Sequence, residues 1–299
     1  MPLNVPDRLP AIELLRKENI FVMDSTRATS QDIRPLRVAM LNLMPLKIDT
    51  ETDLVRVLSN SPLQVELDLI GLQSHESKNT PIEHIREFYI SFDKIRNDRY
   101  DGLIVTGAPV ELLEFEQVNY WDELTQILDW AKTHVTASMF ICWAAQAALY
   151  HYYGVKKYPL PQKMFGIFEH TLNVPHSPLF RGFDEVFFAP HSRHTELRKR
   201  DIEAVSELAI LSESADAGVY IVQGGEGREI FITGHSEYAP ETLGNEYRRD
   251  LAKGLPINIP HNYFHHNNPQ EPPLVRWRSH ANLLFQNWLN YFVYQVTPY

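Results

Sequence analysis

The stretch SMFICWAAQAALY, residues 138–150, joins two patterns at the only cysteine of the 299-residue chain. Up to Cys142 the residues are apolar, as in a buried strand, and the alanine-rich run that follows is typical of a helix. The small side chains of this run, which allow close packing on a sheet, are Ala144, Ala145, Ala147 and Ala148. The stretch therefore predicts a strand, a sharp turn at Cys142 and a helix that covers the sheet.

Strand and helix patterns alternate through the first half of the chain. Nearly continuous apolar strands that alternate with helices are typical of a parallel sheet with helices on both faces. In such a sheet, functional residues gather at the carboxyl ends of the strands. We expect strands at 35–45, 63–72, 100–109 and 137–143, and helices at 52–61, 83–95 and 118–134.

The second half of the chain has a different pattern, because its strand-like segments follow one another with little room for helices between them. This spacing favours extra antiparallel strands on a sheet that continues across both halves. We therefore predict one α/β domain over residues 1–299, with an N-terminal extension (1–34) and a C-terminal loop and helix (255–299) packed on it. The expected strands are 185–193, 207–214, 218–224 and 228–238, and the expected helices are 239–254 and 281–296.

Composition narrows the class of protein. A hydrophobic fraction of 44% with 22% charged residues is ordinary for a globular protein with a sizeable core. One cysteine excludes an intramolecular disulfide framework and favours a reducing compartment. We find neither a signal-peptide pattern nor an apolar run long enough for a membrane span, so we expect a cytoplasmic location and no membrane partner. A formal charge of −10 makes nucleic acid an unexpected partner.

A thiol at a strand-to-helix corner has a catalytic interpretation. The helix N-terminus lowers the pKa of a cysteine from about 8.5, and the backbone N–H of Trp143 would face an oxyanion formed on an attacked carbonyl. This is the geometry of a nucleophile elbow. The alternative is a buried cysteine that fills the core as a small hydrophobe. Position alone favours that alternative, so a base partner is needed.

FITGHSEY (231–238) supplies one. His235 and Glu237 are two residues apart, and in an extended segment both side chains point to the same side. Glu237 could then orient His235 toward Cys142 in a Cys-His-Glu triad. The turn in VTGAP (105–109) could offer a second oxyanion donor, the backbone N–H of Ala108.

Metal binding is the competing use of histidine in this chain. The clusters HNYFHHNN (261–268) and APHSRH (189–194) are rich in histidine. They lack a second cysteine or the helical His/carboxylate spacing of metal sites, so we expect no metal.

Three motifs in their order resemble the class I glutamine amidotransferase-like (flavodoxin-like) fold with its Cys-His-Glu triad. They are DGLIVTGAP (101–109), FICWAAQAAL (140–149) and TGHSEY (233–238). Longer motifs along essentially the whole chain are similar to the MetA family of homoserine O-acyltransferases. These motifs are LNLMP (41–45), NSPLQVELDL (60–69), NTP (79–81), YDGLIVTGAP (100–109), APHSR (189–193), NYFHHNNPQ (262–270) and WRSHANLLFQNWLNYFVYQ (277–295).

The resemblance implies the first committed step of methionine synthesis. An acyl group would pass from acyl-CoA to Cys142 and then to the hydroxyl of L-homoserine, in a ping-pong scheme with His235 as the base and Glu237 as its partner. The resemblance also implies a homodimer, with the acyl-CoA as a co-substrate and no further cofactor.

Three more residues match substrate-binding positions of the family: Lys163 in PQKMFG, Ser192 in APHSR and Arg249 in EYRRD. An arginine is chemically apt, because its planar fork binds a carboxylate such as that of homoserine through two hydrogen bonds. The homoserine hydroxyl is a poor nucleophile at neutral pH and needs a general base.

Glu111, in TGAPVELLEF (106–115), bears on the acyl group. In the family that this chain resembles, Gly at this position is associated with succinyl-CoA and Glu with acetyl-CoA. A carboxylate there would repel the terminal carboxylate of a succinyl group, so we expect acetyl-CoA as the donor and O-acetyl-L-homoserine as the product.

Three alternatives stay open at this point. They are a homoserine O-succinyltransferase, a glutaminase subunit of an amidotransferase, and an inactive binding module with the same fold. Trp143 departs from the small residue usual beside the nucleophile in glutaminases, and the complete triad speaks against an inactive module. We recognise no clear CoA-binding motif, although basic residues such as Lys47 are candidates.

Overall fold

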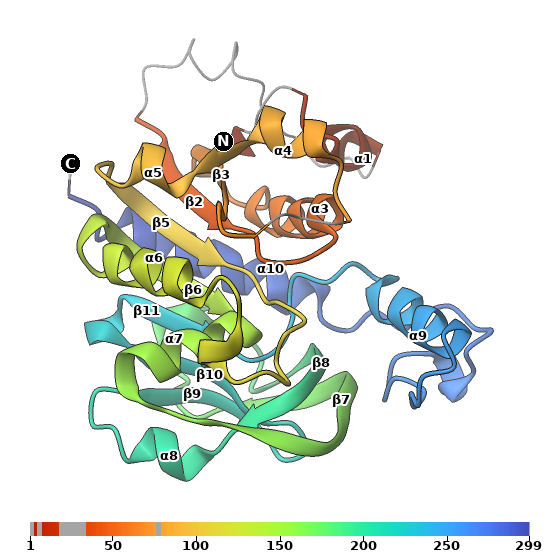
Figure 1. Ribbon diagram of the computed structural model, residues 1–299. Helices are drawn as coiled ribbons and strands as arrows, with labels where there is room; N and C mark the ends of the chain where they lie inside the picture. Colours follow the sequence, from red (N-terminus) through yellow and green to blue (C-terminus); the bar gives the residue numbers. More distant parts are fainter. Residues whose placement is uncertain (1–2, 5–7, 18–33, 76–78, 299) are drawn as a thin grey trace.

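The fold is built on one continuous sheet. The computed structural model describes residues 3–4, 8–17, 34–75 and 79–298 of the chain. In this part of the chain the strand order is β1-β3-β2-β5-β6-β11-β10-β9-β7-β8, and β4 pairs with β3 outside this path (Figure 1). The pairings from β1 to β11 are parallel, and those from β11 to β8 are antiparallel. The predicted class, a largely parallel α/β sheet with antiparallel strands in the C-terminal half, is confirmed.

The strands on the parallel side are β1 (Leu3–Asn4), β2 (Leu36–Leu41), β3 (Val65–Gly71), β4 (Tyr89–Ser91), β5 (Tyr100–Val105), β6 (Val135–Ile141) and β11 (Glu229–Ile232). Those on the antiparallel side are β7 (Lys157–Leu172), β8 (Val186–Leu197), β9 (Ala209–Ser214) and β10 (Gly218–Gly224).

Helices cover both faces of the sheet because alternate side chains of the parallel strands point to opposite faces. In β2, Val38 and Met40 belong to one core, whereas Ala39 and Leu41 belong to the other. The first core is closed by α1 (Ala11–Lys17), α3 (Lys47–Leu58), α10 (Arg278–Asn287) and the π-helix η5 (Trp288–Tyr294). The second is closed by α5 (Phe92–Ile95), α6 (Trp121–His134), α7 (Trp143–Tyr153) and α8 (Lys199–Glu203).

Two local predictions are wrong. The single helix expected at 83–95 is split into α4 (Ile82–Phe88) and α5, because Tyr89–Ser91 leaves the helix and pairs with the end of β3. Strand β7 was not expected, since its first half contains prolines and polar residues and lacks the apolar pattern of a buried strand. Its pairing with β8 is irregular between Pro159 and Met164, where those residues lie.

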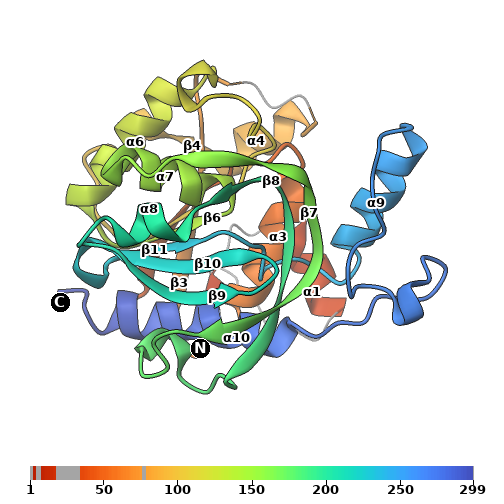
Figure 2. The same cartoon turned by 90° about the horizontal axis from the view of Figure 1, so that it is seen from below.

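Helix α9 (Thr242–Ala252) and the loop that follows it lie to one side of the sheet (Figures 1 and 2). A small apolar cluster that includes Phe165, Leu243 and Trp277 joins them to β7. Gly166 also pairs with the backbone of His261, where a Cβ on the glycine would lie only 2.4 Å from the His261 nitrogen. These contacts hold α9 and its loop against β7. The helix thereby forms one wall of the site described next.

Candidate active site

Cys142 occupies a strained turn between β6 and α7. Its φ of 54° and ψ of −113° lie in a region that non-glycine residues rarely adopt. Its backbone N–H donates to the Ile232 carbonyl at 2.6 Å, which ties the turn to the end of β11. The thiol therefore lies at the carboxyl edge of the sheet, in the elbow geometry expected from the sequence.

His235 and Glu237 lie in the turn that follows β11, and both are buried. The prediction of an extended segment at these residues is wrong. The backbone N–H of Tyr238 donates to the His235 carbonyl at 3.3 Å, which closes a turn. The turn nevertheless brings the two side chains together, with 2.7 Å between His235 Nδ1 and Glu237 Oε1. The backbone N–H of His235 donates to the Pro190 carbonyl at 2.8 Å, which holds this turn against β8.

The charge state of His235 follows from its neighbours. Burial lowers its pKa, but the Cys142 sulfur and the Glu237 carboxylate raise it more, so that the pKa lies well above its ordinary value. Nδ1 faces Glu237, which leaves Nε2 as the ring nitrogen available to Cys142. The arrangement therefore favours the protonated, cationic form of the His235 imidazole.

The glycine turn after β5 lies against the same pair. A Cβ placed on Gly107 would be 3.3 Å from the Cys142 Cβ and 3.5 Å from His235 Cε1. A larger side chain at this position would crowd the Cys142 Cβ, and the small glycine lets the VTGAP turn lie beside the thiol. The oxyanion roles of the Ala108 and Trp143 amides stay predictions.

Lys163, Ser192 and Arg249 converge on one carboxylate, that of Glu246. Lys163 Nζ lies 2.5 Å from Glu246 Oε1, Ser192 donates to Oε2 at 2.9 Å, and Arg249 Nη2 lies 3.5 Å from Oε1. Arg249 is also bound to Asp250, with 2.6 Å between Nε and Oδ1. Sequence reasoning missed Glu246, although it lies one turn before Arg249 on the same helix face.

Tyr238 connects this polar cluster to His235. The two rings stack with centroids 4.2 Å apart and an interplanar angle of 13°. Burial raises the pKa of Tyr238 well above its ordinary value, and the charges of Glu246, Glu237 and Cys142 raise it further. Groups from β7, β8, α9 and the β11 turn therefore surround one small region beside the thiol.

Helix α3 supports the turn that carries Glu237. Asp53 accepts a hydrogen bond of 3.3 Å from the Ala239 backbone N–H and forms an ion pair of 2.8 Å with Arg56. Burial raises the pKa of Asp53 to about 7, although Arg56 opposes that shift. Nothing in the sequence pattern indicated this contact.

Glu111 lies in the loop that leads away from the Gly107 turn. Its backbone carbonyl accepts a hydrogen bond of 2.6 Å from Lys157 Nζ, which also donates to the Leu113 carbonyl. The ammonium of Lys157 lies 4.5 Å from the centroid of the Phe115 ring. The loop backbone is therefore fixed by β7, while the role of the Glu111 side chain in acyl choice stays a prediction.

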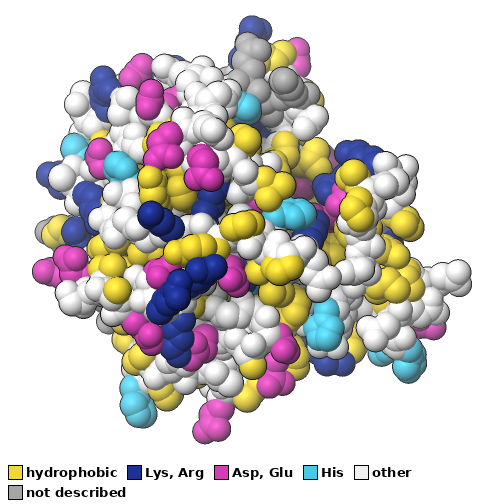
Figure 3. All heavy atoms as spheres, turned by 60° about the horizontal axis from the view of Figure 1, so that its bottom comes forward, with side chains coloured by type: hydrophobic (Ala, Val, Ile, Leu, Met, Phe, Trp, Pro, Cys, Tyr) yellow, Lys and Arg dark blue, Asp and Glu magenta, His cyan; other side chains and the backbone are white. Residues whose placement is uncertain are grey.

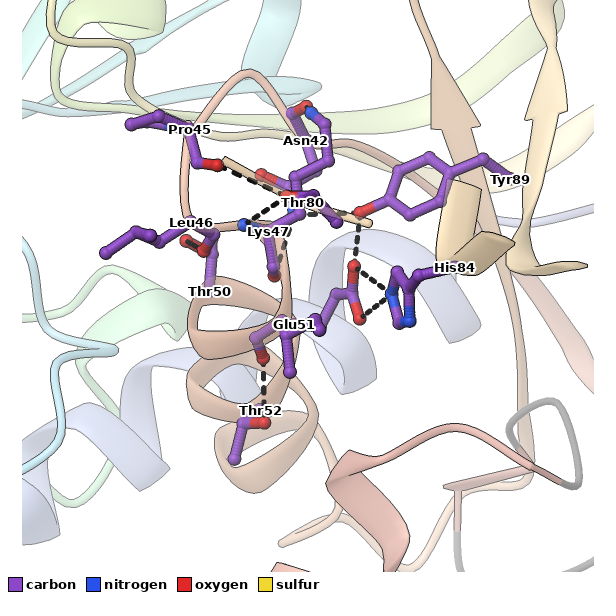
Figure 4. A network of polar contacts seen from close by, with 11 residues as sticks. Asn42, Pro45, Leu46, Lys47, Thr50, Glu51, Thr52, Thr80, His84 and Tyr89 are labelled. Atoms are coloured by element: carbon purple, nitrogen blue, oxygen red, sulfur yellow. Dashed lines mark hydrogen bonds and ion pairs between the residues drawn. The ribbon is translucent and has the colours of Figure 1, made fainter. Parts of the chain in front are cut away.

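Lys47 belongs to a polar network at the carboxyl end of β2 (Figure 4). Its ammonium donates to the Asn42 carbonyl, and the buried Glu51 accepts hydrogen bonds from Tyr89 and, at 3.0 Å, from His84. Burial lowers the pKa of Lys47 to about 8, and the Glu51 charge partly offsets this. Lys47 is thus enclosed in a network rather than presented on an open basic surface.

Other features of the described residues bear on possible ligands. They include no group of three or more His, Cys, Asp or Glu side chains arranged to hold a metal ion. None of the helices in these ranges has the length and apolar character needed to cross a membrane. On the face seen in Figure 3, Lys and Arg side chains are interspersed with Asp and Glu.

Comparison with known proteins places the chain in a family. A family model described as homoserine O-succinyltransferase matches residues 2–299. The chain belongs to this family. Among its relatives, a protein of Bacteroides fragilis named homoserine O-acetyltransferase is 68% identical over 299 residues, which cover 100% of this chain and 98% of that protein. A protein of the same name from Brevibacillus brevis is 61% identical over the same length of this chain.

Solved structures agree on the fold. A glutamine amidotransferase from Thermotoga maritima superposes with a TM-score of 0.58 at 13% identity, over 88% of this chain and 100% of that one. The resemblance inferred from the sequence motifs, to homoserine O-acyltransferases on a glutamine amidotransferase-like fold, is therefore confirmed.

Proposed function

We propose that this member of the homoserine O-succinyltransferase family transfers an acetyl group from acetyl-CoA to the hydroxyl of L-homoserine. The observation that carries the proposal is the Cys142 elbow with the buried His235–Glu237 pair beside it. Relatives named homoserine O-acetyltransferase, which match the chain over its full length, support the acyl group and the acceptor.

The first half-reaction uses the ionised thiol. The Cys142 thiolate attacks the thioester carbonyl of acetyl-CoA, and the amides of Trp143 and Ala108 stabilise the oxyanion. As the intermediate collapses, the bond to the CoA sulfur breaks and His235 gives its proton to that sulfur. The products are free CoA and an acetyl thioester on Cys142, which stays activated for transfer.

Acetylation of the thiol prepares His235 for its second task. The thiolate charge is one of the two influences that raise the pKa of His235, and the thioester is neutral. The pKa of the imidazole therefore falls once Cys142 is acetylated, so that the ring becomes a free base held by Glu237. His235 then takes the proton of the homoserine hydroxyl as its oxygen attacks the thioester, and the Cys142 thiolate leaves.

The acceptor site is proposed around Lys163, Ser192, Arg249 and Glu246. Homoserine is a zwitterion, and this cluster offers cations for its carboxylate and a carboxylate for its ammonium. In the structure, Lys163 and Ser192 both bind the Glu246 carboxylate. Homoserine would replace those contacts with its own two charges.

Arg249→Lys is expected to raise the KM for homoserine about 10- to 100-fold, because the two-point hydrogen bond to a carboxylate is lost while the charge remains. The KM for acetyl-CoA should change little. Steady-state kinetics with each substrate varied in turn measure both. Arg248→Lys, at the exposed neighbouring position that binds Asn245, is the matched control, and an equal KM effect at both positions would contradict the assignment.

Glu111 is proposed to select acetyl over succinyl donors, by repulsion of the succinyl carboxylate. Glu111→Gly is expected to raise kcat/KM for succinyl-CoA relative to acetyl-CoA by about tenfold or more, which corresponds to about 1.4 kcal/mol. Competition between the two donors measures the ratio. Glu114→Gly, in the same loop, should leave it unchanged, and an unaltered ratio in Glu111→Gly would refute this role.

The proposal also covers the cellular location, the oligomeric state, the cofactor requirement and the domain organisation of the protein. We propose a cytoplasmic homodimer that uses acetyl-CoA as a co-substrate without a further cofactor, with residues 1–299 folded as one domain. The single cysteine and the family resemblance support this description.

A side-by-side assay with homoserine as acceptor tests the proposed function. Release of free CoA should be fast with acetyl-CoA, and slow with succinyl-CoA. Ammonia release from glutamine should be absent. Faster turnover with succinyl-CoA would favour the succinyltransferase alternative, and glutamine hydrolysis without acyl transfer would overturn the proposal.

A further inference from the structure

The loop of residues 106–114, which follows β5, is anchored at both ends. At its start, a Cβ on Gly107 would lie 3.3 Å from the Cys142 Cβ. Just after its end, Phe115 is 2% exposed, and its ring stacks on that of Tyr150 with centroids 4.8 Å apart. The loop therefore connects the thiol to the protein core.

The middle of this loop has little packing of its own. Leu112 and Leu113 are 70% and 44% exposed, and Glu111 is only partly buried. The Leu113 N–H donates to the Val110 carbonyl at 3.0 Å, which closes a turn. A segment with few buried apolar contacts opens easily unless further hydrogen bonds hold it.

Lys157, at the start of β7, supplies further hydrogen bonds. Its ammonium donates to the Glu111 carbonyl at 2.6 Å and to the Leu113 carbonyl, and it lies 4.5 Å from the centroid of the Phe115 ring. A lysine ammonium has three donors. Two of them are used on the loop, and the face of the ring stabilises the charge. The Lys157 backbone is itself fixed, because β7 pairs with β8 at this point and Lys157 lies opposite Leu197.

These contacts are with the backbone of the loop and not with its carboxylates. Glu111, Glu114 and Glu116 act on the Lys157 ammonium through their charges alone. At a partly exposed site such charges interact weakly, because water screens them. Hydrogen bonds to two carbonyls, in contrast, fix the positions of both oxygen atoms. The main effect of Lys157 is therefore to hold the loop, and its neutralisation of Glu111 is secondary.

We propose that Lys157 is a specificity-determining residue for the acyl donor, because it holds the loop that carries Glu111. A fixed loop keeps the Glu111 carboxylate where it repels a succinyl group, whereas a loosened loop lets that carboxylate turn toward water. Lys157 is thus a positioning residue, since it acts through Glu111. The inference rests on the proposed role of Glu111 in the selection of acetyl-CoA.

The test is a double-variant cycle on donor choice, measured as kcat/KM for succinyl-CoA relative to acetyl-CoA with homoserine as acceptor. Lys157→Met keeps a long side chain and removes its donors, and it should raise this ratio by about threefold or more. In a Glu111→Gly background it should change the ratio by less than about twofold, because the carboxylate that the loop positions is gone. A merely structural loss would lower kcat/KM for both donors alike and leave the ratio unchanged.

Lys156→Met, at the exposed neighbouring position, is the matched control and should leave the ratio as in wild type. Lys157→Gln, which is shorter and uncharged, gives the same test if Lys157→Met does not fold.

Hydrogen exchange of the backbone amides of residues 110–114 measures the loop directly. Exchange should be faster in Lys157→Met than in wild type by about threefold or more, and it should be unchanged in Lys156→Met. This measurement needs no acyl transfer, so it tests Lys157 even in a protein that transfers no acetyl group. Unchanged exchange in Lys157→Met would overturn the inference.

The kinetic outcomes separate the inference from the proposed function. A ratio that falls in Lys157→Met would show that the ammonium attracts the succinyl carboxylate, and would overturn the inference. An equal change in both backgrounds would overturn it as well, as would an unchanged ratio in Lys157→Met while Glu111→Gly alters it. If Glu111→Gly leaves the ratio unchanged while exchange is faster in Lys157→Met, the proposed role of Glu111 fails and the positioning of the loop by Lys157 is retained.

Discussion

Cys142→Ser is expected to lower kcat/KM for acetyl transfer to homoserine by about 10⁴-fold or more. A serine hydroxyl at this position is not ionised at neutral pH, so the neighbouring imidazolium and helix N-terminus give it no comparable activation. Steady-state release of CoA in the presence of homoserine measures the loss.

Two observations separate this chemical effect from unfolding. Serine is close to cysteine in size, so the variant should keep the far-ultraviolet circular dichroism spectrum and thermal midpoint of the wild type. Cys142→Ala should be at least as inactive as Cys142→Ser. Turnover within about tenfold of wild type in either variant would exclude the thioester mechanism.

His235→Asn is expected to reduce kcat by about 10²- to 10⁴-fold, the range of general acid–base catalysis. The second half-reaction should suffer most, because His235 is the proposed acceptor of the homoserine hydroxyl proton. Rapid-quench measurement of the acetyl-enzyme after homoserine is added gives that rate directly. His176→Asn, at an exposed position, should retain full activity, and fast deacylation in His235→Asn would refute the general-base role.

The same variant gives a pH-dependent stability test. His235 has a pKa raised well above its ordinary value in the folded protein, since Cys142 and Glu237 outweigh the lowering by burial. Its stabilising contribution is therefore fully present below the unfolded value of about 6.5 and is lost as the pH rises through the folded value. The difference in free energy of unfolding between wild type and His235→Asn should shrink with rising pH. A difference that grows with pH would contradict the charge assignment.

The parallel half of the fold could be predicted because buried parallel strands leave continuous apolar runs in the sequence. Strand β7 could not, since its first half is at most partly buried and contains Pro159 and Pro161. The split of the expected helix at 83–95 also escaped prediction, because the pairing of β4 with β3 is a contact between distant segments.

Some residues of the candidate site could likewise be predicted from the sequence, and others could not. Cys142, His235 and Glu237 could be predicted since each follows an apolar strand, and the carboxyl ends of neighbouring parallel strands meet. Asp53 could not, because its contact with Ala239 joins residues 186 positions apart.

The most direct test of the central claim is the intact mass of the protein after incubation with acetyl-CoA in the absence of homoserine. The proposed mechanism predicts one added acetyl group, which peptide mapping places on Cys142 and which homoserine removes. No such species should form in Cys142→Ser. An unmodified wild-type protein that still converts homoserine, or an acetyl group found on another residue, would contradict transfer through Cys142.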